Sequence, residues 1–328
     1  MTKKNNRRKS AKRSGKKGSD FKTNILRALS GIVLLLTLVV LAGITARYLL
    51  FPEKKGMVKP VTEVSGKNKT YADMPEFEVF PGPEEELKEK EVISHSISKQ
   101  RKPRIAIIID DLGYDSSMAG KFLNLNQNIT LAILPHSPLQ RKIATQAHQK
   151  GIEVMLHLPM EPVEYPAIKP GPGALLSSMT TDQMIRQLEE DIDAVPFISG
   201  VNNHMGSKIT AISTRMYQVF SILKKKDLYF VDSRTTKDTL CRSSARLLKI
   251  KFAERDVFLD NIRDPEAIRK QINRLVRRAC ANGEAVGIAH PYKITYTILK
   301  EELLNIQKKA CLVPVSEVVH FTGHVPEV

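Results

Sequence analysis

The sequence predicts an α/β fold for residues 103 to 325, preceded by one N-terminal transmembrane helix. From Pro103 onward, short apolar runs of β-strand character alternate with amphipathic helical stretches. Strict alternation of this kind favours a parallel sheet, either a closed or incomplete barrel or an open doubly wound sheet. The Gly-x-Gly-x-x-Gly and Walker patterns do not occur in the sequence, so nucleotide binding loses its main support.

The strand and helix candidates follow from the period of the apolar residues. Strands are expected at 104–109, 129–134, 152–157, 198–202, 228–232, 256–260, 285–289 and 312–315. Amphipathic helices are expected at 181–195, 213–226, 264–281 and 295–309.

The N-terminal region carries most of the formal charge of +16. Residues 1–27 hold eleven Lys or Arg and one acid, Asp20, which gives 11 − 1 = +10. Residues 28–46 then carry no charge; nineteen helical residues rise about 28 Å, close to the roughly 30 Å of a hydrocarbon core. We predict a transmembrane helix at 28–50, with a cleaved signal peptide as the alternative.

The excess of Lys and Arg before this helix predicts the orientation of the chain. Residues 1–27 would be a basic cytoplasmic tail, and residues 48 to 328 would lie outside the inner (cytoplasmic) membrane, in the periplasm or its equivalent. Nucleic-acid binding is therefore not expected, because topology already explains the charge.

Two further features limit the organisation of the chain. Residues 51–102 are rich in Lys, Glu, Pro, Ser and Gly, and we predict a disordered linker. The three cysteines are Cys241, Cys280 and Cys311, with no pair at short spacing, which indicates neither a disulfide framework nor a thiolate metal site.

Asp110 and Asp111 end the apolar run 104–109 and are the most informative pair in the chain. Two adjacent carboxylates at this place repel each other unless a cation or a shared proton relieves them. The alternative is that Asp110 caps a turn and Asp111 starts the next helix.

Polar clusters also follow the other strand candidates, where the reactive groups of parallel α/β folds gather. The seven clusters are Asp110 and Asp111, Pro135 to Ser137, His157 to Pro162, Asn202 to Ser207, Asp232 to Thr236, Asp260 and Asn261, and His290 to Tyr292. Asp and His with a nearby Glu suit a divalent metal, with zinc favoured. A metal-activated water and a neighbouring carboxylate would hydrolyse an amide or ester.

Four of these segments resemble the motifs of the divergent polysaccharide deacetylase family, a branch of the carbohydrate esterase deacetylases with an irregular (β/α) barrel. The segments are Ile109-Asp110-Asp111-Leu112-Gly113, His157-Leu158-Pro159-Met160-Glu161-Pro162, Asn202-Asn203-His204-Met205-Gly206-Ser207 and Gly287-Ile288-Ala289-His290-Pro291. The resemblance covers about 103 to 320 and implies an irregular (β/α)7-8 barrel. Residues 103–325 are assigned to this domain.

The resemblance implies a role for each matching residue. Asp110 would be the general base and Asp111 a metal ligand. His157 matches the family's first histidine ligand, whereas Glu161 stands where the second histidine is expected. Either Glu161 binds the metal, or His204 completes the set; Asp111, His157 and His204 are the favoured ligands.

The remaining roles concern proton transfer and substrate. His290 resembles the family's late histidine, which protonates the leaving amine or stabilises the oxyanion, and Asp232 would orient His290 or the base. Glu161, Asn203 and Tyr292 are assigned to substrate binding.

Two functions from different classes fit the sequence. The first is a membrane-anchored, metal-dependent hydrolase that deacetylates an amino-sugar polysaccharide of the cell envelope. The alternative is a non-catalytic envelope barrel that binds glycan or a cell-wall enzyme; the altered ligand set and the lack of Trp motivate it. A metal hydrolase acting on a peptide or small ester would share the same site.

Overall fold

The computed structural model describes residues 102–322. The predicted tail at 1–27, the predicted helix at 28–50 and residues 51–101 of the predicted linker lie outside this range, as do residues 323–325 of the predicted domain. Within residues 102–322, no helix combines the length and apolar character needed to cross a bilayer.

The strands of the described residues form a single sheet. They are β1 (Arg104–Leu112), β2 (Thr130–Ile133), β3 (Glu153–Met160), β4 (Ile198–Met205), β5 (Tyr229–Asp232), β6 (Lys251–Glu254), β7 (Val257–Phe258), β8 (Glu284–Ala289), β9 (Cys311–Leu312) and β10 (His320–Phe321). Their order is β10-β6-β5-β4-β3-β2-β1-β8-β7, and β9 also pairs with β1. The pairings are parallel except for that of β10 with β6.

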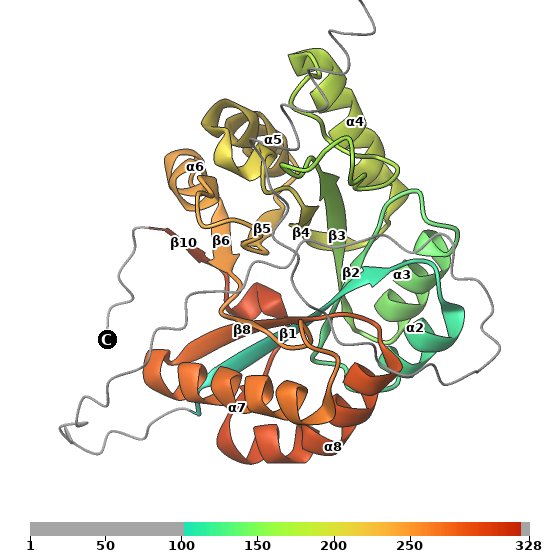
Figure 1. Cartoon of the computed structure of the whole chain (residues 1–328), viewed down its shortest axis with the longest axis vertical. Helices are drawn as coiled ribbons and strands as arrows, with labels where there is room; N and C mark the ends of the chain where they lie inside the picture. The colour runs from blue at the N-terminus through green and yellow to red at the C-terminus, as the bar shows by residue number, and fades with distance from the viewer. Residues whose placement is uncertain (1–101, 323–328) are drawn as a thin grey trace, which may run out of the picture. The chain divides into compact units, whose positions relative to one another are not determined.

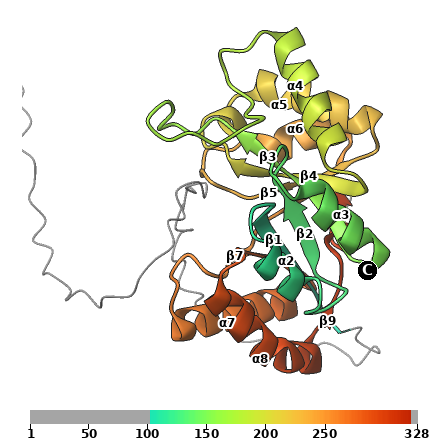
Figure 2. The same cartoon turned by 90° about the vertical axis from the view of Figure 1, so that its right-hand side faces the viewer.

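The helices cover the outside of this sheet (Figures 1 and 2). They are α2 (Ser116–Phe122), α3 (Gln140–Gln149), α4 (Thr181–Ala194), α5 (Ser213–Lys225), α6 (Cys241–Leu248), α7 (Pro265–Asn282) and α8 (Lys293–Lys309), with short 3₁₀ turns η1 (Ile209–Ala211) and η2 (Val315–Glu317). The four predicted helices are confirmed to within two residues at each end, whereas α2, α3, α6 and strands β6 and β10 were not predicted from the sequence.

The sheet is a half-barrel that hydrogen bonds do not close within the described part of the chain. β6 pairs with β5 near one end of the strand order, where only β10 lies beyond it, and β7 pairs with β8 at the other end. Only Arg255 and Asp256 join them in sequence. The predicted α/β architecture is confirmed, and of the alternatives considered the incomplete barrel is the correct one.

Alternating residues of the strands enter two separate apolar cores, as expected for a parallel sheet buried on both faces. In β1, Ile105, Ile107 and Ile109 pack with the helices, while Ala106 and Ile108 join a second cluster that contains no α-helical residue. The segment from Val313 to Val319 also contributes to this inner cluster. Positions of one parity in each strand therefore face the inside of the half-barrel.

Candidate metal centre

An irregularity in β1 brings Asp111 to the site beside Asp110. Ile109 pairs with Leu131 and Leu112 with Ile133, so two residues of β1 are accommodated against one of β2. Asp111 has φ of 55°, in the left-handed region, and such bulges redirect side chains beside functional sites. Helix α2 begins later, with Asp115 as its N-cap. The interpretation of the Asp pair as a turn cap and a helix start is therefore wrong.

Asp111, His157 and His204 converge at the ends of β1, β3 and β4. Oδ1 of Asp111 lies 3.1 Å from Nε2 of His157 and 3.0 Å from Nδ1 of His204, and the two imidazole nitrogens are 3.1 Å apart. All three side chains are buried. They form the one group of His, Cys, Asp or Glu among residues 102–322 with the spacing of a metal site.

The electrostatics of this cluster favour an ionised carboxylate. Burial by itself would raise the pKa of Asp111, but the charge of His204 and the close approach of both imidazoles outweigh it and hold this pKa well below its usual range. Burial likewise opposes protonation of His157, yet Asp110 and Asp111 raise its pKa. The cluster therefore pairs negative charge on Asp111 with adjacent imidazoles.

Asn202, which the sequence-based assignments missed, connects this cluster to Asp110. Its Nδ2 donates to Oδ1 of Asp110 over 2.8 Å, and its Oδ1 lies 2.9 Å from Nδ1 of His157. Because an amide oxygen can only accept, Nδ1 of His157 must carry the hydrogen. Nε2 is thereby directed at Asp111 and His204, as in metal sites whose histidines are oriented by a second hydrogen bond.

Asp110 lies beside the cluster as a buried carboxylate with a perturbed pKa. Burial raises its pKa, and the charge of neighbouring Asp111 adds to this, while His157, His290 and the hydrogen bond from Asn202 act in the opposite direction. The net pKa is raised, which suits a group that accepts a proton near neutral pH.

His290 lies on the other side of the site and is held by Asp260. Its Nδ1 is 2.9 Å from Oδ1 of Asp260, and its backbone N–H donates to Oδ2 of the same carboxylate over 2.7 Å. Although burial lowers the pKa of His290, Asp260 and then Asp111 and Asp110 raise it to about 9. Nε2 lies 3.9 Å from Oδ2 of Asp111, so the protonated ring faces the cluster.

The prediction that Asp232 orients His290 or the base is wrong. Oδ1 of Asp232 accepts from the backbone N–H of Arg234 over 2.8 Å and Oδ2 from Oγ1 of Thr239 over 2.7 Å. The physical reason is strand alternation: in β5, Tyr229 and Val231 face the inner cluster, so Asp232 faces outward. Asp260 has the role that was assigned to Asp232.

Asn203 does not face the site, contrary to its assignment to substrate binding. Its Nδ2 donates to the carbonyl of Met205 over 2.7 Å, and its Oδ1 accepts from the N–H of Ser233 over 2.9 Å. It is adjacent to Asn202 and therefore points to the opposite face of β4. Its amide bonds neighbouring backbone rather than facing the cluster.

Glu161 is buried but engaged outside the cluster. Its carboxylate accepts from Nζ of Lys208 over 2.6 Å and from the backbone N–H of Ser177. Although burial opposes ionisation, these hydrogen bonds lower the pKa of Glu161. Of the two alternatives for the third ligand, the geometry favours His204 over Glu161.

Tyr292 remains a candidate for substrate binding at the margin of the site. Its ring lies 6.0 Å from that of His290, and the guanidinium of Arg263 lies 4.0 Å from the centre of the Tyr292 ring. The ring is half-buried, so part of its surface faces solvent beside His290.

The residues present fit a divalent cation. Asp111 Oδ1 is buried without a hydrogen-bond partner among residues 102–322, although it faces two imidazole nitrogens. Tetrahedral zinc with ligand bonds near 2.1 Å separates its ligand atoms by roughly 3.4 Å; the observed separations of 3.0 to 3.1 Å are close to this value. One carboxylate and two imidazoles are also the donor types that zinc accepts in open sites.

The comparisons with known proteins agree with the fold and the motifs. The divergent polysaccharide deacetylase family matches residues 107–319, and the chain belongs to this family. The uncharacterised protein YibQ of Escherichia coli K12 is 35% identical over 217 residues, which cover 66% of this chain and 67% of YibQ. An uncharacterised protein of Haemophilus influenzae is 30% identical over 210 residues, covering 64% of this chain and 74% of that protein.

A solved structure shares the fold. An uncharacterised protein from Agrobacterium tumefaciens C58 superimposes with a TM-score of 0.65 at 24% identity, covering 68% of this chain and 92% of that protein.

Proposed function

We propose that this chain is a metal-dependent hydrolase that deacetylates an amino-sugar polysaccharide of the cell envelope. The observation that carries the proposal is the convergence of Asp111, His157 and His204 beside a buried carboxylate, Asp110, and an imidazole, His290, both with raised pKa values. Membership of the divergent polysaccharide deacetylase family supports an amino-sugar substrate.

In this proposal, Asp111, His157 and His204 hold a divalent cation, with zinc favoured. Such a cation supplies a Lewis acid that polarises an amide carbonyl and lowers the pKa of water. The half-barrel holds the three ligands at the carboxyl ends of β1, β3 and β4, and the pairing of these strands within one sheet limits movement of the ligands when a cation binds.

Two groups of the chain would then transfer protons during amide hydrolysis. Asp110, held by Asn202, accepts a proton from the water that attacks the carbonyl carbon. His290, held by Asp260, donates a proton to the nitrogen as the C–N bond breaks, which yields the free amine and the carboxylic acid. One group with an elevated carboxyl pKa and one with an elevated imidazole pKa are suited to these opposite roles.

Tyr292 would supply an aromatic surface for a sugar ring next to His290. The Arg263 guanidinium on the Tyr292 ring fixes its orientation, and the tyrosine hydroxyl accepts from Nη2 of Arg263 over 3.0 Å. Apolar faces of sugars stack on such rings.

We also propose that residues 28–50 anchor the chain in the cytoplasmic membrane, with the domain on the outer side. The uncharged run and the basic flank support this arrangement. Fractionation of cells with an alkaline wash tests it: an anchored chain stays with the membrane, and a released chain contradicts the proposal.

The test of the activity uses the full-length chain loaded with zinc and an oligomer of N-acetylglucosamine, with released acetate as the readout. We expect turnover that D110N and H157A each abolish, while N203A, which alters a residue facing away from the site, retains it. Zinc uptake without acetate release from any acetylated amino sugar would contradict the proposed reaction and favour a glycan-binding role.

A further inference from the structure

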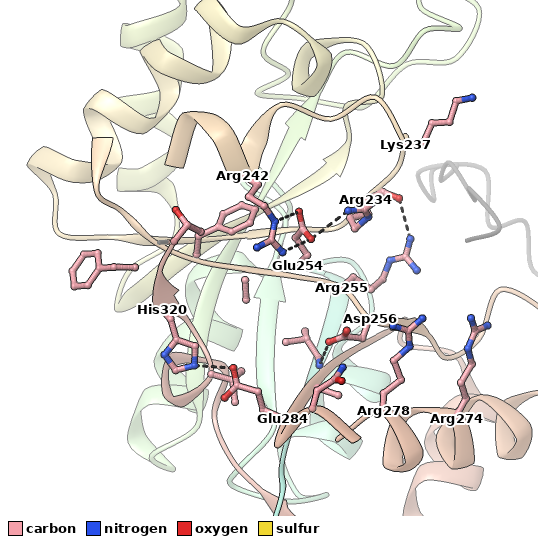
Figure 3. A pocket seen from close by; sticks show the side chains of 18 of the residues that line it. Arg234, Lys237, Arg242, Glu254, Arg255, Asp256, Arg274, Arg278, Glu284 and His320 are labelled. Carbon is pink, nitrogen blue, oxygen red and sulfur yellow. Dashed lines mark hydrogen bonds and ion pairs between the residues drawn. The ribbon is translucent and has the colours of Figure 1, made fainter. Parts of the chain in front are cut away.

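A basic pocket lies at the opening between the two edges of the half-barrel, and we call it the seam pocket. Its cavity volume is about 600 Å³. Its lining includes residues of β6, α7, β8 and β10, and the two residues between β6 and β7. The cationic residues of its lining are Arg234, Lys237, Arg242, Arg255, Arg274 and Arg278. Figure 3 shows Arg274 and Arg278 rising from α7 on one side of the pocket, with Arg234 and Arg255 on the other.

Cations outnumber acids in the seam pocket. Against the six cationic side chains stand Glu254, Asp256 and Glu284, which leaves 6 − 3 = +3. Glu254 is already shared by Arg234 at 3.2 Å and Arg242 at 2.6 Å. Glu284 is likewise engaged, by Arg104 and by His320, each at 2.7 Å.

Three cations therefore keep binding capacity. Among residues 102–322, Lys237 and Arg274 have no carboxylate within ion-pair distance. Nε of Arg278 is buried and lacks a hydrogen-bond partner in the same range, although the guanidinium charge acts on Asp256. A buried guanidinium nitrogen without a partner is unfavourable until an acceptor reaches it.

Arg255 lies in the wall of the seam pocket, and its charge also acts on Asp110 beside the proposed metal site. Its Nε donates to the carbonyl of Ser233 over 2.7 Å and its Nη2 to that of Arg234 over 3.0 Å, which fixes the guanidinium in the wall. Burial lowers the pKa of Arg255 to about 10, so the group stays charged at neutral pH. Asp111, His157, His204 and His290 do not line the seam pocket, so its lining shares no residue with the proposed metal site.

We propose that the seam pocket binds a small polyanion that carries two or more phosphate groups. Guanidinium groups present paired N–H donors that match phosphate oxygens, and Arg274 and Arg278, one helical turn apart, can engage adjacent groups. The volume lies within the range of small-molecule sites rather than of protein-docking surfaces. The proposal does not depend on the hydrolase activity.

Titration of the full-length chain with sodium tripolyphosphate by calorimetry tests this site. The titration is made in the D111N background without metal, so that chelation at the metal site does not contribute. We expect saturable 1:1 binding that R274A/R278A weakens by at least about tenfold, because two charge-assisted contacts are lost. Alanine at these positions preserves the propensity of α7 for helix.

The matched control is R277A/K300A, which removes the same charge from exposed positions of α7 and α8 outside the pocket. We expect it to bind as tightly as the parent, so that the loss of two positive charges by itself cannot explain the result. If R274A/R278A unfolds, R274Q/R278Q, which keeps the side-chain length, is measured instead. Absence of saturable binding, or equal weakening by the pocket pair and the control pair, would overturn the proposal.

Discussion

Replacement of Asn202 by Ala, compared with a matched control, distinguishes the effect of this residue on zinc affinity from its effect on the stability of the fold. The Asn202 amide is buried, accepts from His157 over 2.9 Å and donates to Asp110 over 2.8 Å. N202A leaves the Nδ1–H of His157 and one carboxylate oxygen of Asp110 without the hydrogen-bond partner that Asn202 supplies. Each loss destabilises the folded state by about 1–3 kcal/mol. We expect the free energy of unfolding to fall by roughly 2–6 kcal/mol.

The same change should weaken zinc binding. Without Asn202, the Nδ1 hydrogen and the ring orientation of His157 are no longer fixed, and loss of such supporting hydrogen bonds lowers metal affinity by about 10- to 100-fold. That range equals about 1.4–2.8 kcal/mol. Competition against a chromophoric chelator measures the zinc affinity, and urea unfolding followed by far-UV circular dichroism measures the stability.

Asn203→Ala is the matched control, because it removes an equally buried amide from the next position of the same strand. Its partners are the carbonyl of Met205 and the N–H of Ser233. We expect a comparable loss of stability and an unchanged zinc affinity. Equal weakening of zinc binding by N202A and N203A, or no weakening by N202A, would refute the inferred tautomer and orientation of His157.

Three further tests, which use four substitutions, address separate parts of the structure. G200A should lower the free energy of unfolding by about 1–3 kcal/mol, because the added Cβ would lie 2.2 Å from a ring carbon of Tyr229. G120A, whose added Cβ would lie in open space on helix α2, should raise the free energy of unfolding by about 0.5–1 kcal/mol. Urea unfolding of the two variants and the parent measures both changes. Burial raises the folded-state pKa of Asp191 from 3.8 to about 7, so the contribution of this carboxyl to stability is complete below pH 3.8 and is lost as the pH rises toward 7. The melting temperature of the parent should therefore fall over this pH range, and that of D191N should lack this decline. A parallel decline in both proteins would contradict the prediction. E161Q should retain zinc, as measured by elemental analysis. The lost, partially exposed ion pair with Lys208 should lower the free energy of unfolding by at most about 1 kcal/mol. Loss of zinc would identify Glu161 as a ligand.

Strand alternation explains which site residues the sequence could predict. The polar clusters follow the carboxyl ends of the strands, as expected for a parallel α/β fold, and Asp110, His157, His204 and His290 occupy inner-face positions there. The two incorrect assignments, Asp232 and Asn203, are on the outer face. Counting parity from the apolar residues of each strand would have excluded both.

The same count would have found the residues that were missed. Asn202 and Asp260 both stand in the predicted polar clusters, and each shares the inner-face parity of its strand or of the residues that follow it. Asp260 is two residues after Phe258, which packs on the inner cluster. Their exact partners, His157 and His290, depend on which strands are neighbours.

Other features could not be read from the chain. Asp111 has the opposite parity to Asp110 and reaches the site only because β1 is irregular and its φ is positive. The seam pocket requires β6 and β7 to pair near opposite ends of the sheet, although two residues separate them in sequence. Both follow from long-range pairing rather than from local pattern.

Metal content tests the central claim most directly. The full-length chain, purified without chelators and then supplied with zinc, is analysed by elemental analysis beside H157A and H204A. The account predicts close to one zinc per chain, lost in both variants, because both imidazoles belong to the cluster with Asp111. A folded parent chain that takes up no zinc or other divalent metal would contradict the account and favour a non-catalytic glycan-binding protein.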